Sequence, residues 1–167
     1  MRLDSLTVAC LALAAHPGAY ANGPPITCTT DCTIVVTVDE TDTTTAGHCK
    51  PVVPSHITIN RTDPSASLVI TWTLEKSASS DGFRFSKGLD HEKRGILLTE
   101  PPPPPPSHYT HKGPTGVVGA LFKSYQWTVS PPTSASDKDE RAYEVNVRRR
   151  PPGDLCAAAD PVIVNMN

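Results

Sequence analysis

The segment Ser67-Leu68-Val69-Ile70-Thr71-Trp72-Thr73-Leu74 decides the fold class of this chain. Its apolar residues alternate with Val69, Thr71 and Thr73, and this period of two is typical of a strand with one face against a core. β-Branched residues, which favour strands, are frequent in the segment. Because a buried indole removes a large apolar area from water, we expect Trp72 to anchor the core.

The same alternation recurs in short segments along the chain. These segments cover residues 32–38, 51–60, 83–85, 95–99, 121–130, 142–148 and 161–165. The residues expected to face the core are Cys32, Ile34, Val36, Val38, Ile57, Ile59, Phe83, Phe85, Tyr125, Trp127, Val129, Tyr143, Val145 and Val147. The 18 prolines argue against a helical protein, because a proline inside a helix costs about 3 kcal/mol. We therefore predict an all-β fold, an antiparallel β-sandwich of about seven or eight strands.

Length and composition fit one domain. The chain has 167 residues, of which 38% are hydrophobic and 19% are charged, and its formal net charge is -2. A chain of this length can bury a core of its own. The near-neutral charge gives no basis for a nucleic-acid partner. We predict a single β-sandwich domain over residues 22–167.

Residues 1–21 carry the pattern of an export signal. Arg2 supplies a positive charge, residues 6–15 are mainly apolar, and Ala19-Tyr20-Ala21 is a small-x-small cleavage sequence. The apolar run is shorter than the roughly 20 residues that span a bilayer, so we expect no transmembrane segment. We predict a periplasmic or secreted protein. The alternative is a lipoprotein signal in which Cys10 carries the lipid.

Four cysteines follow the predicted signal: Cys28, Cys32, Cys49 and Cys156. An even number in an exported chain favours two disulfides, and four cysteines allow three pairings. We favour a pairing in which Cys156 ties the C-terminal segment to the N-terminal pair Cys28 and Cys32. A bridge that closes so long a loop would stabilise the fold by about 4 kcal/mol.

Two loops are the expected contact surfaces of the domain. Residues 75–80 are mostly small and polar, and residues 101–116 contain a run of six prolines at 101–106. Consecutive prolines donate no backbone hydrogen bond, so this run predicts a polyproline II segment outside the sheets. We interpret it as a stiff spacer between strands, with a ligand for an aromatic groove as the alternative.

The histidines and serines form no strong catalytic or metal-binding motif. His108 and His111 lie after the proline run and are weak candidates for metal ligands. A blue-copper site needs two histidines and a cysteine thiolate, usually with a weak axial methionine, but no histidine follows Cys156. No Gly-x-Ser-x-Gly sequence marks a nucleophile. We therefore predict no cofactor and no enzyme activity, and interpret the two histidines as exposed loop residues.

Two polar motifs have both a structural and a functional interpretation. Arg148-Arg149-Arg150 ends a predicted strand, where three like charges discourage edge-to-edge aggregation, and an anionic surface is the alternative partner. Asn60-Arg61-Thr62 is a glycosylation sequon. Residues 61–65 also predict a turn, because Pro64 fits the first central position of a turn.

Motifs in the middle and towards the end of the sequence occur in a combination that has a precedent. Ile70-Thr71-Trp72-Thr73-Leu74 is followed by Gly82-Phe83-Arg84-Phe85 and Gly88-Leu89, and later by Tyr143-Glu144-Val145-Asn146-Val147 and Asp160-Pro161-Val162-Ile163-Val164-Asn165. The Trp strand, the Gly-Phe-x-Phe strand and the Asp-Pro-x-Ile-x-Asn tail together resemble a group of uncharacterised exported bacterial proteins. The resemblance implies an immunoglobulin-like or cupredoxin-like sandwich and export, and it carries no site residues.

These features together favour a binding or structural role over catalysis. We expect an exported, non-catalytic β-sandwich of the cell envelope, with a protein or glycan partner. The first alternative is a metal-binding or redox protein that uses His108 and His111. The second is a hydrolytic enzyme whose carboxylate pair or serine–histidine pair converges only in the fold.

Overall fold

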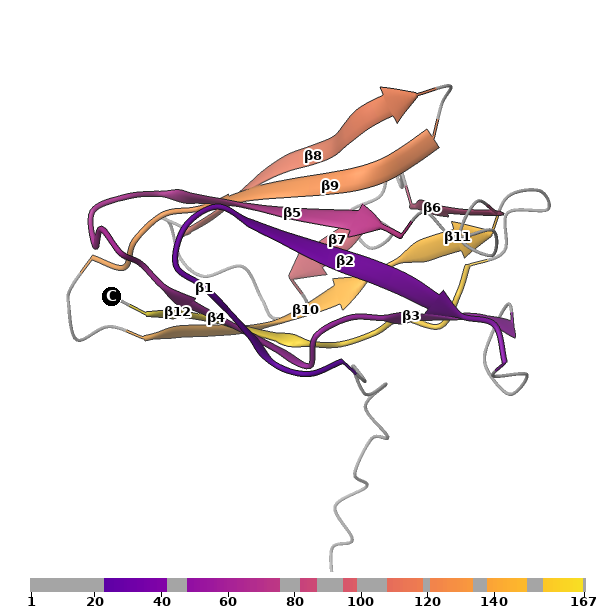
Figure 1. The fold of residues 1–167 in the computed structure, drawn as a ribbon, viewed down its shortest axis with the longest axis horizontal. Helices are drawn as coiled ribbons and strands as arrows, with labels where there is room; N and C mark the ends of the chain where they lie inside the picture. Colours follow the sequence, from indigo (N-terminus) through magenta and orange to yellow (C-terminus); the bar gives the residue numbers. More distant parts are fainter. Residues whose placement is uncertain are drawn as a thin grey trace, which may run out of the picture.

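The computed structural model describes eight parts of the chain, and all statements about the structure refer to them. They are residues 23–41, 48–75, 82–86, 95–98, 108–118, 121–133, 138–149 and 155–166. Twelve strands and no helical element lie in these ranges, so the described part of the protein is nearly all β (Figure 1).

Two five-stranded sheets and one two-stranded ribbon make up the fold. The first sheet has the order β3-β2-β5-β9-β8, with β3 at Lys50–Val52, β2 at Cys32–Asp39, β5 at Leu68–Leu74, β9 at Leu121–Val129 and β8 at Tyr109–Val118. The second sheet has the order β1-β4-β12-β10-β7, with β1 at Ile26–Cys28, β4 at His56–Asn60, β12 at Val162–Met166, β10 at Asp139–Val145 and β7 at Ile96–Leu98. The ribbon pairs β11 at Val147–Arg149 with β6 at Phe83–Phe85. This arrangement is compatible with a β-sandwich.

The purely antiparallel pairing predicted from the sequence is wrong. Three pairs of strands are parallel, namely β1 with β4, β4 with β12, and β2 with β5. Parallel neighbours cannot be joined by a tight hairpin and need a crossover. The chain provides these crossovers because β1 is followed by β2 in the other sheet, and β3 by β4 in the other sheet.

The predicted count of seven or eight strands is not confirmed, and residues 142–148 show one reason. They were expected to form one alternating strand, but β10 ends at Val145 and β11 begins at Val147. Val145, Asn146 and Val147 are all buried, so the alternation stops at Asn146. The Asn146 N–H donates to the carbonyl of Gly95 at 2.7 Å, and its carbonyl accepts from Ser86 at 3.0 Å. These bonds hold the chain where it leaves one sheet for the ribbon.

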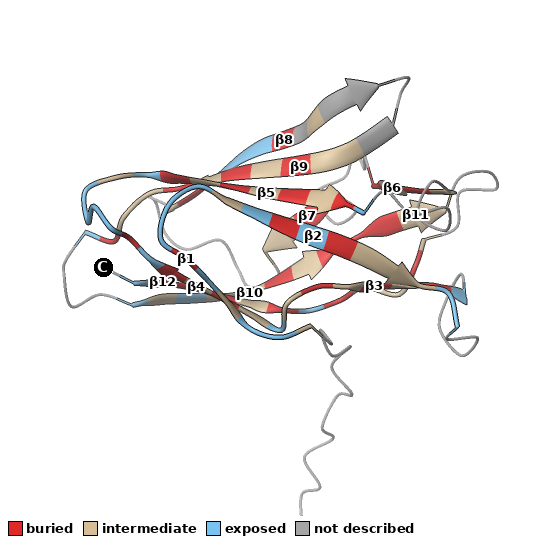
Figure 2. Ribbon diagram, viewed as in Figure 1, coloured by how far each residue is buried: buried red, intermediate tan, exposed pale blue. Residues whose placement is uncertain are grey.

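The core lies between the sheets, and its centre is aromatic. Trp72 of β5 contacts Trp127 of β9 and Tyr143 of β10, with ring centroids 5.5 Å and 5.7 Å away. Buried and half-buried residues alternate along all seven residues of β5, as the sequence predicts (Figure 2). Cys32 and Val38 differ from the prediction, because they are half-buried and pack at the margin of the core. The other residues expected to face the core are buried.

Two cysteine pairs lie at disulfide distance, as predicted, but the favoured connectivity is wrong. Cys28 is bonded to Cys32, and Cys156 is bonded to Cys49. The Ala157 N–H donates to the carbonyl of Cys49 at 3.0 Å, which places residues 155–157 beside Cys49 rather than beside the N-terminal pair. The Cys49–Cys156 bridge has a Cα–Cα distance of 4.9 Å and a sequence separation of 107.

Several predictions fall on residues outside the described ranges. They concern the export signal at 1–21 with Cys10, the proline run at 101–106, most of the loop at 75–80, and Arg150. The described residues include no helix of sufficient length and hydrophobicity to cross a membrane.

Candidate functional site

An open edge of β2 is the starting point of the candidate site. β2 pairs with β5 over residues 32–36 and with β3 over residues 37–39. On the side of β2 that faces away from β5, residues 32–36 therefore pair with no strand in the described part of the chain. Five residues of a strand span about 17 Å, so the open edge is long enough for a short extended peptide.

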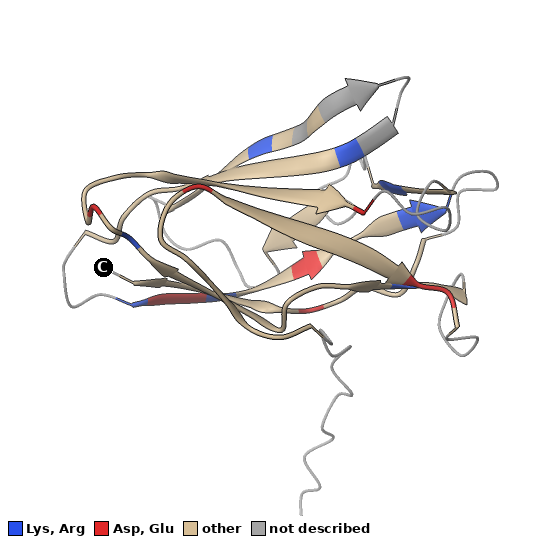
Figure 3. Cartoon of the chain, viewed as in Figure 1, with Lys and Arg blue, Asp and Glu red and all other residues tan. Residues whose placement is uncertain are grey.

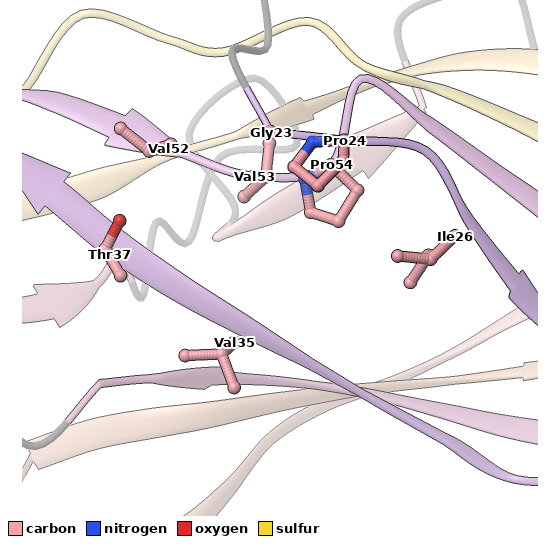
Figure 4. Close-up of a pocket in the computed structure, with 8 residues that line it drawn as sticks. All are labelled: Gly23, Pro24, Ile26, Val35, Thr37, Val52, Val53 and Pro54. Carbon is pink, nitrogen blue, oxygen red and sulfur yellow. The ribbon is translucent and has the colours of Figure 1, made fainter.

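An apolar groove of about 220 Å³ lies beside this edge (Figure 4). β2 contributes Val35 and Thr37, and β1 with the residues before it contributes Gly23, Pro24 and Ile26. The end of β3 and the connection to β4 contribute Val52, Val53 and Pro54. Six of these eight residues are apolar, and none carries a charge. Val35 is 54% exposed and, with Met166, is one of two large hydrophobic residues that are exposed in the described part of the chain.

The wall of the groove opposite β2 is held by backbone hydrogen bonds. The Gly23 N–H donates to the carbonyl of Val53 at 2.9 Å, and the Ser55 N–H donates to the carbonyl of Gly23 at 3.0 Å. A Cβ atom on residue 23 would lie 2.7 Å from that Val53 oxygen, so a side chain here would force the two segments apart. Glycine thus allows the close approach that forms the wall.

One end of the groove is fixed by covalent and polar contacts. The disulfide from Cys28 to Cys32 joins the end of β1 to the start of β2. Between these cysteines, the Asp31 carboxylate accepts a hydrogen bond from the Val69 N–H at 2.8 Å. The edge strand is therefore held in place before any ligand arrives, which lowers the entropic cost of binding.

The lining limits the chemistry that the groove can perform. It contains no titratable side chain and no thiol, and Thr37 is its single hydroxyl residue. Asp39 is the one charged residue of β2 and lies at the C-terminal end of the strand (Figure 3). The groove can therefore bind apolar groups and offer backbone hydrogen bonds, and it has no general acid, base or nucleophile of the usual kind.

The predicted histidines do not line this groove. The interpretation of His111 as a loop residue is wrong, because it lies on β8, where its Nε2 forms a hydrogen bond with the Tyr125 hydroxyl and the centroids of the two rings are 5.0 Å apart. His108 precedes β8, and its carbonyl accepts from the Ser130 N–H at 2.7 Å. Within the described ranges, no group of three or more His, Cys, Asp or Glu side chains could hold a metal ion.

Sequence reasoning missed the role of Arg61, which is 7% exposed although its neighbours form the predicted turn. Its guanidinium donates to the Asn165 side-chain oxygen at 2.6 Å and to the carbonyls of Ala66, Val129 and Met166 at 2.8, 3.1 and 3.0 Å. Burial lowers the pKa of Arg61 from its usual value. No periodic pattern in the sequence predicts that this arginine is buried. Its partners are mostly backbone atoms, and most of them belong to strands that are distant in the sequence.

The arginines at the end of the predicted strand take different positions. Arg149 pairs with Glu40 at 3.1 Å, and its guanidinium lies 5.3 Å from the centroid of the Phe83 ring. Arg148 donates from Nε to the Ser86 hydroxyl at 3.1 Å. The two arginine side chains therefore have different partners and do not form one continuous charged edge.

The protein defined by these features is a nearly all-β chain with two disulfides and an apolar groove at the edge of one sheet. Comparison of its sequence with known protein families and with curated proteins finds no match.

Proposed function

We propose that this chain is an exported, non-catalytic binding module of the cell envelope, and that its groove accepts an extended apolar segment of a partner protein. The observation that carries the proposal is the combination of the apolar groove with the open edge of β2 at residues 32–36. An immunoglobulin-like or cupredoxin-like sandwich is the architecture proposed with it.

An extended peptide fits this site better than a compact ligand. A strand added at a sheet edge gains main-chain hydrogen bonds, and its alternate side chains enter apolar pockets. β2 offers the main-chain groups, and Val35, Val52 and Ile26 offer the apolar contacts. The absence of charge in the lining favours apolar side chains over charged ones in the peptide.

Export is supported by the cysteines and by the pattern of residues 1–21. Disulfides persist in oxidising compartments and are rare in the cytosol. The disulfide between Cys28 and Cys32 fixes the end of the groove. The disulfide between Cys49 and Cys156 joins residues that are 107 positions apart in the sequence. The proposal therefore places the mature protein in the periplasm or outside the cell.

The test uses a synthetic fluorescent peptide with alternating threonine and valine. We expect saturable binding in fluorescence polarisation. Val35→Lys should weaken binding at least tenfold, because it puts a charge into the apolar groove. Val69→Lys is the matched control, because Val69 is a half-buried valine of the same sheet outside the groove, and it should leave binding unchanged.

Two outcomes would contradict the proposal. Equal binding by the wild type and Val35→Lys would place the peptide elsewhere. A stable dimer of the chain in light scattering, lost in Val35→Lys, would mean that a second copy occupies the edge instead of a partner.

A further inference from the structure

The main-chain groups of β2 point alternately to its two sides within the sheet. The Glu75 N–H donates to the Val36 carbonyl at 2.9 Å, so Val36 directs its main-chain groups towards β5. Because this direction reverses at each residue of a strand, Ile34 also points towards β5. Thr33 and Val35 therefore direct their N–H and C=O groups towards the open edge.

The pairing of β2 with β3 gives the same assignment independently. Pro51 lies opposite Val38 and has no N–H, so it fits the position of an antiparallel ladder at which directly opposed residues exchange no hydrogen bond. The hydrogen-bonded pairs are then those of the neighbouring positions, and Thr37 faces β3. Val35 is two residues away and faces the same side.

Both sides of this edge lie in the described part of the chain, which covers residues 23–41 and 48–75 here. In these ranges, no strand pairs with Thr33 or Val35 on the side opposite β5. The two residues thus present two N–H donors and two C=O acceptors in a row. An added strand binds to main-chain groups of this kind.

The length of the edge favours one direction for a bound segment. In an antiparallel pair, the residue opposite Thr33 and the residue opposite Val35 each exchange two hydrogen bonds, so three consecutive residues are sufficient. A parallel segment distributes the same bonds over five residues and extends to a position opposite Val36. There it would meet the chain of β3, which pairs Val52 with Thr37 and continues into Val53.

The register also decides which side chain of the partner enters the groove. Directly opposed residues of an antiparallel pair project from the same face of the sheet. Val35 lines the groove and is 54% exposed, whereas its neighbours Ile34 and Val36 are buried. The partner residue opposite Val35 therefore contacts the uncharged, mainly apolar lining, and an apolar side chain suits this position.

We propose that the partner segment runs antiparallel to β2, exchanges main-chain hydrogen bonds with Thr33 and Val35, and places an apolar side chain opposite Val35. This inference rests on the proposed peptide-binding function and adds the direction, the register and the residue class of the partner. The recognised segment has an apolar residue whose own N–H and C=O face β2.

The first test uses two N-methylated forms of the alternating threonine and valine peptide. Methylation of the valine nitrogens removes the donors that face β2 and should weaken binding at least tenfold in fluorescence polarisation. Methylation of the threonine nitrogens adds equally bulky groups on the opposite side and should leave the affinity unchanged. A parallel complex with valine opposite Val35 would give the reverse result, because its facing groups belong to the threonines.

The second test removes one donor from the protein. Thr33→Pro deletes the N–H that faces the open edge, and proline is tolerated where the N–H of an edge strand points away from the sheet. Thr33 does not line the groove, so the apolar contacts are unchanged. We expect affinity about fivefold weaker, because one hydrogen bond is lost. Thr33→Val is the matched control, because it keeps the N–H and should bind like the wild type.

The outcomes separate this inference from the function on which it rests. A loss of affinity on threonine methylation, or full affinity in a folded Thr33→Pro, would overturn the register while Val35→Lys still reports binding at the groove. Failure of the unmethylated peptide to bind the wild type would overturn the proposed function and this inference together. Circular dichroism establishes that Thr33→Pro is folded, and if it is not, the methylated peptides decide.

Discussion

The core and the groove are both lined by apolar side chains, and adjacent residues of β2 contribute to each. Ile34 is 1% exposed in the core, whereas Val35 is 54% exposed at the groove. Both residues favour strands, and both would be equally suited to a dry interior. The difference arises because successive side chains of a strand project from opposite faces, and the second sheet covers the face that Ile34 occupies. The groove beside Val35 is the feature on which the proposed binding function rests.

The substitution with the largest expected effect lies at the centre of the core. Trp72→Ala should lower the free energy of unfolding by about 3–5 kcal/mol, because it removes a buried indole and leaves a cavity against Trp127 and Tyr143. Urea denaturation followed by circular dichroism measures the change. Val69→Thr, on the half-buried face of the same strand, should cost much less. Equal costs would mean that both faces of β5 are covered, and the contrast between core and surface would fail.

The two disulfides also test the contrast between core and groove, because one crosslinks distant parts of the fold and the other fixes the end of the groove. Replacing Cys49 and Cys156 together by alanine should cost about 2–4 kcal/mol, because it releases a loop closed across 107 residues. Replacing Cys28 and Cys32 should cost less, since that loop is short, but it should weaken peptide binding because it frees the end of the groove. Denaturant unfolding and peptide titration of the two double variants separate the effects. A larger stability loss from the short loop would contradict this assignment.

Arg61 links the two sheets by polar contacts, because it donates to Val129 of β9 in one sheet and to Asn165 of β12 in the other. Arg61→Ala should cost about 2–3 kcal/mol, because it leaves the Asn165 side chain and the Val129 carbonyl without their buried donor. Arg61→Lys should not restore the loss, since an ammonium cannot reproduce the planar fork. Thermal unfolding compares the three proteins. Full rescue by lysine would show that charge alone matters at this position.

Tyr143 offers a substitution that should raise the free energy of unfolding instead of lowering it. Its hydroxyl is buried and has no hydrogen-bond partner in the described part of the structure. Tyr143→Phe should therefore stabilise the protein by about 1 kcal/mol, because it removes an unsatisfied polar group and keeps the ring. The measurement is the urea midpoint at constant slope. A destabilisation would indicate that the hydroxyl has a partner after all.

The smallest effect is expected at the groove. Val35→Ala should change the free energy of unfolding by less than about 0.5 kcal/mol, because the side chain is mostly in water already. Ile34→Ala, one residue away, should cost about 2–5 kcal/mol. Unfolding curves of the two variants give the ratio directly. A large cost at Val35 would mean that the groove belongs to the core and not to a binding surface.

The strands of the core could be predicted because burial on one face leaves a period of two in the sequence, and Leu68, Ile70 and Trp72 display it plainly. The pairing of the strands could not be predicted, because the same alternation serves parallel and antiparallel neighbours. The disulfide from Cys49 to Cys156 likewise depends on which segments the topology brings together. The groove left no periodic signal either, since Val35 occupies an outward position that any strand contains.

The position of β12 in the second sheet also governs when the fold can form. It lies between β4 and β10, and it pairs with both of them. That sheet remains divided until residues 162–166 have been synthesised. Complete pairing of this sheet therefore comes late in synthesis, which is compatible with the export that we propose.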